Sequence, residues 1–180
     1  VNLCGVEMFL KVAEALKTSK AVLIMHNGKF DLKFIHRAGV KLDNPIYDTM
    51  LAEQVLAKGL RKNGFGLADV VRNYLGIELD KSEQKSQWMR EELTETQLVY
   101  AANDVRYLHN IREKQLKIAK QEGLESTIDL ENEAVKPTYQ MELAGIYVDE
   151  IKLISLQEKL TEEKEEMLGE IRALLPNIKN

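Results

Sequence analysis

The feature that most constrains the fold is a short apolar run followed at once by a turn and a helix. Residues 21–26 (AVLIMH) are too few for a stable helix and rich in branched side chains, which predicts a buried parallel strand. Asn27 and Gly28 form the turn, and Gly39 follows the helical segment, where a left-handed residue favours glycine. This βα unit predicts an α/β fold.

Most of the remaining chain has helical spacing of apolar residues. Asp48 is expected to cap one helix, and Thr94 with Gln97 fits a capping box at the start of another. Residues 57–66 have the glycines and adjacent cations of a loop. In chain order, the predicted elements are helices at 6–19, 29–38, 49–58 and 67–75, a loop with a helical turn at 80–93, helices at 94–121 and 124–144 (bent or broken at Pro137), a brief strand at 146–148, and a final helix from Asp149.

Composition and charge exclude several classes of protein. With 25 basic and 29 acidic residues the net charge is −4, unlike a basic nucleic-acid-coating tail or a polybasic membrane anchor. No stretch approaches the roughly 20 apolar residues that span a bilayer, so no membrane partner is expected. Cys4 is the single cysteine and has no disulfide partner. The chain begins at Val1 without a secretory pattern, so we expect a cytoplasmic setting and missing upstream sequence.

Asp31 occupies an unusual position for a carboxylate. With Phe34, Ile35 and Ala38 it fits the buried face of its helix. A charged carboxylate there needs a metal ion, a cation or amide donors to offset the cost of leaving water. Asp31 also lies in the first turn, where the helix N–H groups alone would stabilise an anion. The pattern leaves both explanations open.

Tyr100 and Asp104 lie four residues apart, at the shoulder of the apolar stripe of the 94–121 helix. A helix can pack on a sheet there while it offers polar groups to a cleft, which suits a metal-binding carboxylate beside a phenol. A boundary tyrosine and a solvated aspartate explain the same spacing. The stripe itself consists of Leu98, Ala101, Ala102, Val105, Leu108, Leu116 and Ala119.

Two runs resemble motifs of the proofreading 3′→5′ exonuclease domain of family A DNA polymerases. HNGKFDLKFIHRAG contains Asn27, Phe30 and Asp31 in the order of the second exonuclease motif. YAANDVRYL is similar to the third motif, Tyr-x-x-x-Asp, of the tyrosine-bearing DEDD exonucleases. The segments between them resemble both these polymerases and the ribonuclease D group, so the resemblance covers about residues 20–120.

The resemblance implies a fold and a domain organisation. Residues 1–125 would form a ribonuclease H-like exonuclease fold that lacks its first strands. Residues 126–180 would form a long helical extension, comprising a connection and the start of the polymerase thumb. The passage MELAGIYVDEIKL, from Met141, looks like the entry to the thumb, and Asn27 matches the polymerase form of its motif. The final helix would then pack on a downstream polymerase domain of the same chain.

The resemblance also implies a reaction, the hydrolysis of the 3′-terminal phosphodiester of single-stranded DNA with two Mg²⁺ or Mn²⁺ ions. Asp104 would bind the ion that carries the nucleophilic water, and Asp31 would hold the second ion through water. Tyr100 would orient the attacking water. Asn27 and Phe30 would touch the terminal nucleotide, although core packing explains Phe30 equally well.

Two features limit these expectations. Arg61 and Lys62 are candidates for phosphate contacts, but a solvated loop accounts for them too. The family's first motif, Asp-x-Glu, supplies the other metal ligands and should lie upstream of Val1. The one Asp-x-Glu in the chain, at residues 129–131, lies in a helical stretch after the third motif and is rejected as a substitute. The 180 residues alone are therefore expected to bind metal poorly and to cleave little or nothing.

Two other functions stay open. One is an RNA 3′ exonuclease of the ribonuclease D kind, which a preference for RNA over DNA ends would reveal. The other is a non-catalytic domain that keeps the fold to bind nucleic acid or to scaffold a polymerase. The presence of Asp31, Tyr100 and Asp104 together weighs against the second, while the absence of the first motif keeps it open.

Overall fold

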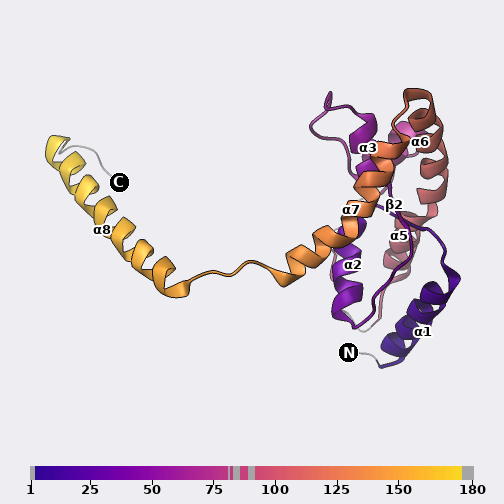
Figure 1. The fold of residues 1–180 in the computed structure, drawn as a ribbon, viewed down its shortest axis with the longest axis horizontal. Helices are drawn as coiled ribbons and strands as arrows, with labels where there is room; N and C mark the ends of the chain where they lie inside the picture. The colour runs from indigo at the N-terminus through magenta and orange to yellow at the C-terminus, as the bar shows by residue number, and fades with distance from the viewer. Residues whose placement is uncertain (1–2, 81, 83–85, 89–91, 176–180) are drawn as a thin grey trace. The chain divides into compact units, whose positions relative to one another are not determined.

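The structure is a computed structural model that describes residues 3–80, 82, 86–88 and 92–175. The chain divides into two compact units between Leu143 and Ala144. The elements, in chain order, are α1 (Leu3–Ser19), β1 (Leu23–Met25), α2 (Gly28–Arg37), β2 (Ile46–Asp48), α3 (Thr49–Leu56), α4 (Leu67–Leu75), α5 (Glu95–Arg106), α6 (Leu108–Glu122), α7 (Glu125–Ala144) and α8 (Glu150–Leu174) (Figure 1). Among the described residues, no helix is both long and apolar enough to cross a membrane.

The two strands form a small parallel sheet. Leu23 lies opposite Ile46 and Met25 opposite Asp48. The parallel strand predicted at 21–26 is present but shorter, and it is partly buried rather than buried, because Leu23, Ile24 and Met25 are all of intermediate exposure. β2, which is buried, was not predicted because three residues after a proline carry too little pattern. Since the strands are parallel, their carboxyl ends meet at one edge, and the turn at Asn27 comes to lie beside Asp48.

Three clusters of buried apolar side chains hold the first unit together. α6 packs on α3 and α4 and supplies Ile111 and Ala119 (Figure 1). α7 supplies Ile128, Val135 and Tyr139 to two of the clusters. This burial explains why the compact unit extends to Leu143, past the domain boundary expected near residue 125.

A buried polar network joins α6 to α3 and β2. Gln115 is fully buried, and its Nε2 donates to the Thr49 carbonyl (2.9 Å) and to the Glu53 carboxylate (3.2 Å). The Tyr47 hydroxyl donates to Gln115 Oε1 (3.4 Å), and burial raises the pKa of Tyr47. Because every one of these groups is buried, each hydrogen bond replaces one that water would otherwise make.

The helix predicted over 94–121 is two helices separated at Tyr107. The capping box is confirmed, because Thr94 Oγ1 accepts from the Gln97 N–H (3.2 Å) and Gln97 Oε1 accepts from the Thr94 N–H (3.0 Å). The predicted apolar stripe is buried in α6 but not in α5, where Leu98 and Val105 are exposed. Helical spacing identifies one face and does not ensure that a partner covers it.

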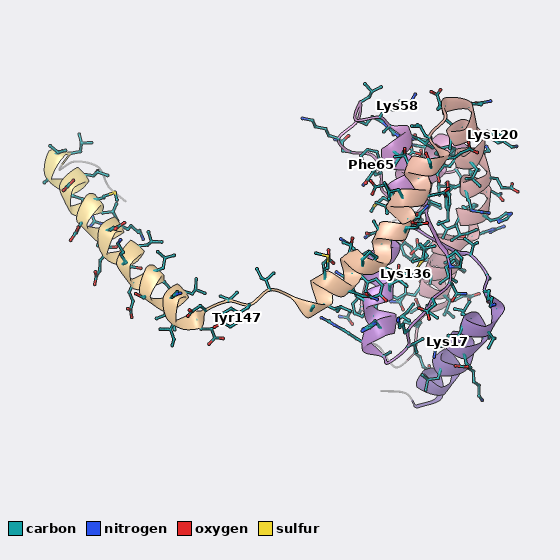
Figure 2. All side chains as sticks on the ribbon, viewed as in Figure 1. Lys17, Lys58, Phe65, Lys120, Lys136 and Tyr147 are labelled. Atoms are coloured by element: carbon teal, nitrogen blue, oxygen red, sulfur yellow. The ribbon has the colours of Figure 1, made fainter. Side chains whose placement is uncertain are left out.

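One expectation near the C-terminus is wrong. Residues 146–148 form no strand, and the Tyr147 side chain there is 91% exposed (Figure 2). Of the two alternatives at Pro137, a bend or a break, the break is excluded, because α7 continues through this residue. The predicted cap of the final helix is confirmed, since the Asp149 carboxylate accepts from the Lys152 N–H (3.1 Å), and no residue of α8 is buried.

Candidate functional site

A cleft of about 620 Å³ opens where β1 ends. Asn27, Phe30 and Asp31 line it from the turn and α2, while Tyr100 and Asp104 line it from α5. The structure therefore brings together five of the seven residues that sequence reasoning singled out. Nothing in local spacing required this, because the two groups lie far apart in the chain.

The turn between β1 and α2 has an unusual backbone. Asn27 adopts a left-handed conformation (φ 57°, ψ 42°), which non-glycine residues rarely adopt. Gly28 then starts α2 against the strand, and a Cβ at this position would lie 2.7 Å from the Met25 side chain. A side chain at position 28 would collide with Met25, so glycine is required for α2 to start this close to β1. Asp31 follows in the first turn of α2.

The prediction that Asp31 lies on the buried face of its helix is wrong. α2 buries Gly28 and Leu32, while Asp31 is exposed and Phe34 is 58% exposed. Phe30 is 55% exposed, which contradicts the core-packing explanation of its presence. The rings of Phe30 and Phe34 contact each other at 5.0 Å between centroids, on the open side of the helix.

The carboxyl groups and the phenol that line the cleft all have raised pKa values. Partial burial raises the pKa of Asp31, and the neighbouring charges of Asp48 and Asp104 raise it further, against a lowering by a backbone hydrogen bond. Partial burial also raises the pKa of Asp104. The pKa of Tyr100 is raised by burial and then by Asp104 and Asp80, so its phenol stays protonated and can donate a hydrogen bond.

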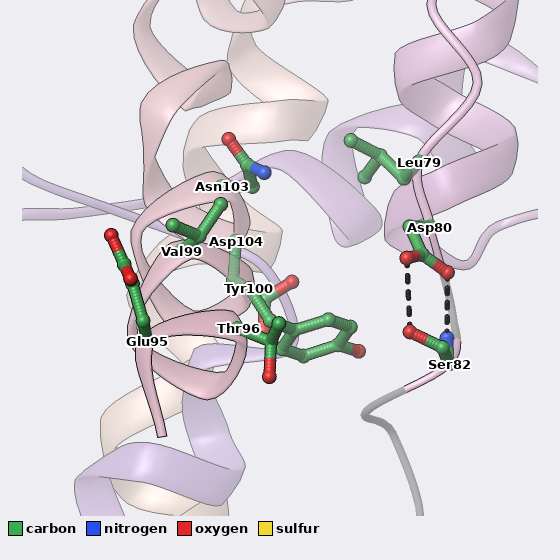
Figure 3. A pocket seen from close by; sticks show the side chains of 9 residues that line it. All are labelled: Leu79, Asp80, Ser82, Glu95, Thr96, Val99, Tyr100, Asn103 and Asp104. Atoms are coloured by element: carbon green, nitrogen blue, oxygen red, sulfur yellow. Dashed lines mark hydrogen bonds between the residues drawn. The ribbon is translucent and has the colours of Figure 1, made fainter. Parts of the chain in front are cut away.

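Tyr100 also lines a second hollow, of about 360 Å³, beside the cleft. Its ring reaches from α5 toward Asp80 and Ser82 (Figure 3). The Asp80 carboxylate accepts from the Ser82 N–H (2.8 Å) and from its hydroxyl (2.9 Å). The Trp88 ring lies 5.9 Å from the Tyr100 ring. Tyr100 thus forms part of the wall between the two hollows.

Arg61 and Lys62 do not line the cleft. Arg61 forms an ion pair with Glu53, which is 4% exposed, and its guanidinium lies 5.3 Å from the centre of the Phe65 ring. Arg61 therefore compensates a buried carboxylate. Lys62 is exposed, and Gly66 is the residue of this loop that reaches the cleft.

Asp31 and Asp104 are the carboxylates of the cleft among the described residues, and Asp80 lines a neighbouring hollow with Asp104. Within the described ranges, no group of three or more His, Cys, Asp or Glu side chains is placed to hold a metal ion. The Asp-x-Glu at 129–131 lies on α7, and Asp129 lines a separate hollow with Lys136. Its rejection as a substitute for the first motif agrees with this position.

His26 is a polar residue of the cleft that sequence reasoning did not assign to the site. Its Nδ1 lies 3.0 Å from Thr49 Oγ1, and burial lowers its pKa against an opposing effect of Asp48. The available signal was its position as the last residue of the predicted strand, directly before the motif asparagine.

A known protein family matches the part of the chain that forms this cleft. Residues 4–120, which include the whole cleft, match the sequence profile described as 3′-5′ exonuclease. The chain belongs to the 3′→5′ exonuclease family. The match also includes both motifs that were singled out above and the loop between α3 and α4.

Two kinds of protein are similar to this chain in sequence. Ribonuclease D from Serratia proteamaculans is 41% identical over 96 residues, which are 53% of this chain and 25% of that protein. DNA polymerase I from Aquifex aeolicus is 40% identical over 89 residues, which are 49% of this chain and 15% of that protein. The chain thus spans a quarter or less of the length of these relatives.

Solved structures support the fold. NrnC from Brucella melitensis, bound to pGG, matches with a TM-score of 0.67 and 27% identity over 74% of this chain and 64% of that chain. NrnC with bound Mg²⁺ matches with a TM-score of 0.61 and 26% identity over 69% and 59% of the two chains. The predicted ribonuclease H-like exonuclease fold is confirmed, as a mostly helical unit with a small sheet.

Proposed function

We propose that this chain provides the site of a 3′→5′ exonuclease that removes nucleotides from single-stranded 3′ ends with the help of divalent ions. The observation that supports the proposal is the meeting of Asp31, Tyr100 and Asp104 in one cleft of an exonuclease fold. Two carboxylates and a protonated phenol are groups that suit metal-assisted hydrolysis of a phosphodiester.

Asp31 and Asp104 fit a hard divalent cation. Both offer oxygen ligands, which Mg²⁺ and Mn²⁺ prefer, and a bound cation would offset the effects that raise the pKa of each carboxyl. A bound ion would supply a Lewis acid that offsets phosphate charge and activates water. The Tyr100 hydroxyl would donate a hydrogen bond that orients this water toward the phosphate.

Phe30 and Asn27 would receive the terminal nucleotide. The Phe30 ring is more than half exposed beside Asp31, and an aromatic face can stack on any base. The Asn27 side chain makes no capping bond to its own helix, so its amide is available to the sugar or phosphate. Arg61 is assigned no substrate contact, because its charge compensates Glu53.

RNA is the proposed substrate. Ribonuclease D proteins from several bacteria align with this chain, and two of them align over 84% of it, which extends beyond α6. A DNA end is the second candidate, and a specific observation favours it. The segment from Met141 through α8 resembles the entry to a polymerase thumb, and α8 exposes its apolar residues in the second unit.

Binding to matched oligonucleotides tests the proposal. We expect linear single-stranded RNA to bind in the presence of Mn²⁺ more tightly than a circular RNA of the same sequence, because the site requires a free 3′ end. Asp104→Ala should weaken binding of the linear RNA by at least about tenfold. Fluorescence polarisation measures each affinity, and Lys152→Ala on α8 serves as a control that removes one exposed charge elsewhere.

The same titration separates the candidates. Tighter binding of linear DNA than of linear RNA would favour the proofreading function over the ribonuclease. Equal binding of circular and linear strands, unchanged by Asp104→Ala, would contradict an exonuclease site and support a non-catalytic binding domain.

A further inference from the structure

Asp48 makes more hydrogen bonds than the cap of one helix requires. It is 1% exposed and ends β2, directly before α3. Its Oδ1 accepts from the N–H groups of Met50 (2.9 Å) and Leu51 (3.3 Å), which is the expected cap of α3. Oδ1 also accepts from the Asn27 N–H (3.1 Å), and Oδ2 accepts from the Gly28 N–H (2.7 Å).

The second pair of bonds belongs to a different helix. Asn27 is the N-cap residue of α2 but makes no side-chain cap bond of its own, so Asp48 satisfies these donors from the neighbouring strand. The parallel register explains the reach, because Met25 lies opposite Asp48 and the chain turns into α2 just after it. Thr49 Oγ1 adds a bond to the Met25 carbonyl (3.0 Å).

The bonds from Asn27 and Gly28 to Asp48 lie at the turn whose backbone is strained. Asn27 has a positive φ, which is unfavourable for a residue with a Cβ unless its surroundings fix it. Two charge-assisted bonds to adjacent N–H groups fix both the orientation of this turn and the first turn of α2. Asn27 and Asp31 leave from that turn toward the cleft.

Asp48 is not suited to be a metal ligand itself. Both of its oxygens already accept N–H groups, it is almost completely buried, and it does not line the cleft. Without these bonds, a carboxylate so close to Asp31 would suggest a third metal ligand.

We propose that Asp48 is a positioning residue, which bridges the starts of α2 and α3 and so holds Asn27 and Asp31 toward Asp104. The purpose of this positioning, which is to bind substrate and metal, rests on the proposed function. An ordinary cap of α3 would need the Met50 and Leu51 donors alone, and a serine would serve nearly as well.

Two variants separate bridging from simple capping. Asp48→Asn keeps an oxygen for α3 but presents an amide N–H₂ to the Gly28 N–H, which cannot bond to it. Asp48→Ser keeps the α3 cap with a single oxygen that is too short to serve both helices, and provides a second measurement should Asp48→Asn be unstable. Asn44→Ala is the control, because it removes two buried bonds, to the Leu16 and Ala21 carbonyls, outside the cleft.

Two measurements are made on each variant of the whole chain: amide hydrogen exchange by NMR, and affinity for linear single-stranded RNA in Mn²⁺. We expect both Asp48 variants to speed exchange at Gly28 by at least about tenfold and to weaken RNA binding by about tenfold. Exchange at Asn27 should become faster in Asp48→Ser alone, because Asp48→Asn keeps the Oδ1 acceptor of the Asn27 N–H. Exchange at Leu51 should change little in either. Asn44→Ala should lower the melting temperature without either effect.

Three outcomes would overturn the inference. Unchanged exchange at Asn27 and Gly28 would show that Asp48 does not hold the turn. Faster exchange with RNA affinity within about twofold of the unsubstituted chain would show that the turn does not position the site. Equal weakening by Asn44→Ala would reduce the effect to general stability. Equal binding of linear and circular RNA by the unsubstituted chain would instead overturn the proposed function, while the exchange data would still decide whether the bridge exists.

Discussion

α5 and α6 follow one another in the chain and share one predicted apolar stripe, but they are held in different ways. α6 buries Leu108, Ile111, Gln115 and Ala119 against its neighbours. α5 buries Gln97 alone, although it carries both Tyr100 and Asp104. The helix with the buried residues is thus separate from the helix that carries two of the proposed site residues. α5 is held by its capping box, by the bonds that the Gln97 amide donates to Ser86 Oγ and the Gln87 carbonyl, and by its junction with α6.

The largest expected difference between the two helices is in core packing. Ile111→Ala on α6 should destabilise the chain by about 2–5 kcal/mol, because it empties a fully buried site. Leu98→Ala on α5, where the side chain is 55% exposed, should cost less than about 0.5 kcal/mol. Urea denaturation followed by circular dichroism measures both. An equal cost would show that the α5 face is covered in solution.

Gln115→Ala tests whether the polar network stabilises α6 as its packing does. The change removes the amide donor of the Thr49 carbonyl and one of the donors of the Glu53 carboxylate, which keeps Arg61, so we expect a loss of about 1–3 kcal/mol. Gln121→Ala, at an exposed position on the same helix, is the matched control. A loss no greater than that of the control would mean that water replaces the missing amide.

Thr94→Ala should affect α5 more than α6. It removes the acceptor of the Gln97 N–H at the start of α5, at a cost of about 1 kcal/mol. Amide exchange should become faster along Glu95–Arg106 and remain slow at Ile111 and Gln115 of α6. Uniform acceleration in both helices would show that they unfold as one unit, so that α5 is not held separately from α6.

Asp31→Asn has the smallest expected effect, and its sign depends on pH. A carboxyl whose folded-state pKa is raised above its ordinary 3.8 favours the folded state at low pH and loses that contribution as the pH rises through the raised pKa. Without metal, Asp31→Asn should therefore stabilise the chain at pH 7 relative to pH 3, by less than about 1 kcal/mol because solvent screens an exposed group. Melting curves at the two pH values measure this, and destabilisation at pH 7 would contradict the cause given for the shift.

The sequence predicted features that depend on neighbours in the chain. The capping box at Thr94, the cap at Asp48 and the bounds of α4 follow from residues within one helical turn, and all were confirmed. The exposed stripe of α5 was not predictable, because spacing identifies a face without its partner. The bridge from Asp48 to Asn27 and the pairing of Arg61 with buried Glu53 depend on tertiary placement that spacing does not encode.

The meeting of Asp31 and Asp104 was expected from the motif resemblance, and its test is whether one ion senses both. Mn²⁺ broadens the NMR signals of nearby amides even at low occupancy, so ¹H–¹⁵N spectra recorded during a Mn²⁺ titration address the claim directly. We predict that amides of residues 27–31 and 100–104 broaden at the same Mn²⁺ concentration, and that Asp104→Ala abolishes the effect in both segments. The acidic helix α8 reports non-specific binding. Broadening confined to one segment, or retained at residues 27–31 in Asp104→Ala, would contradict a shared metal site.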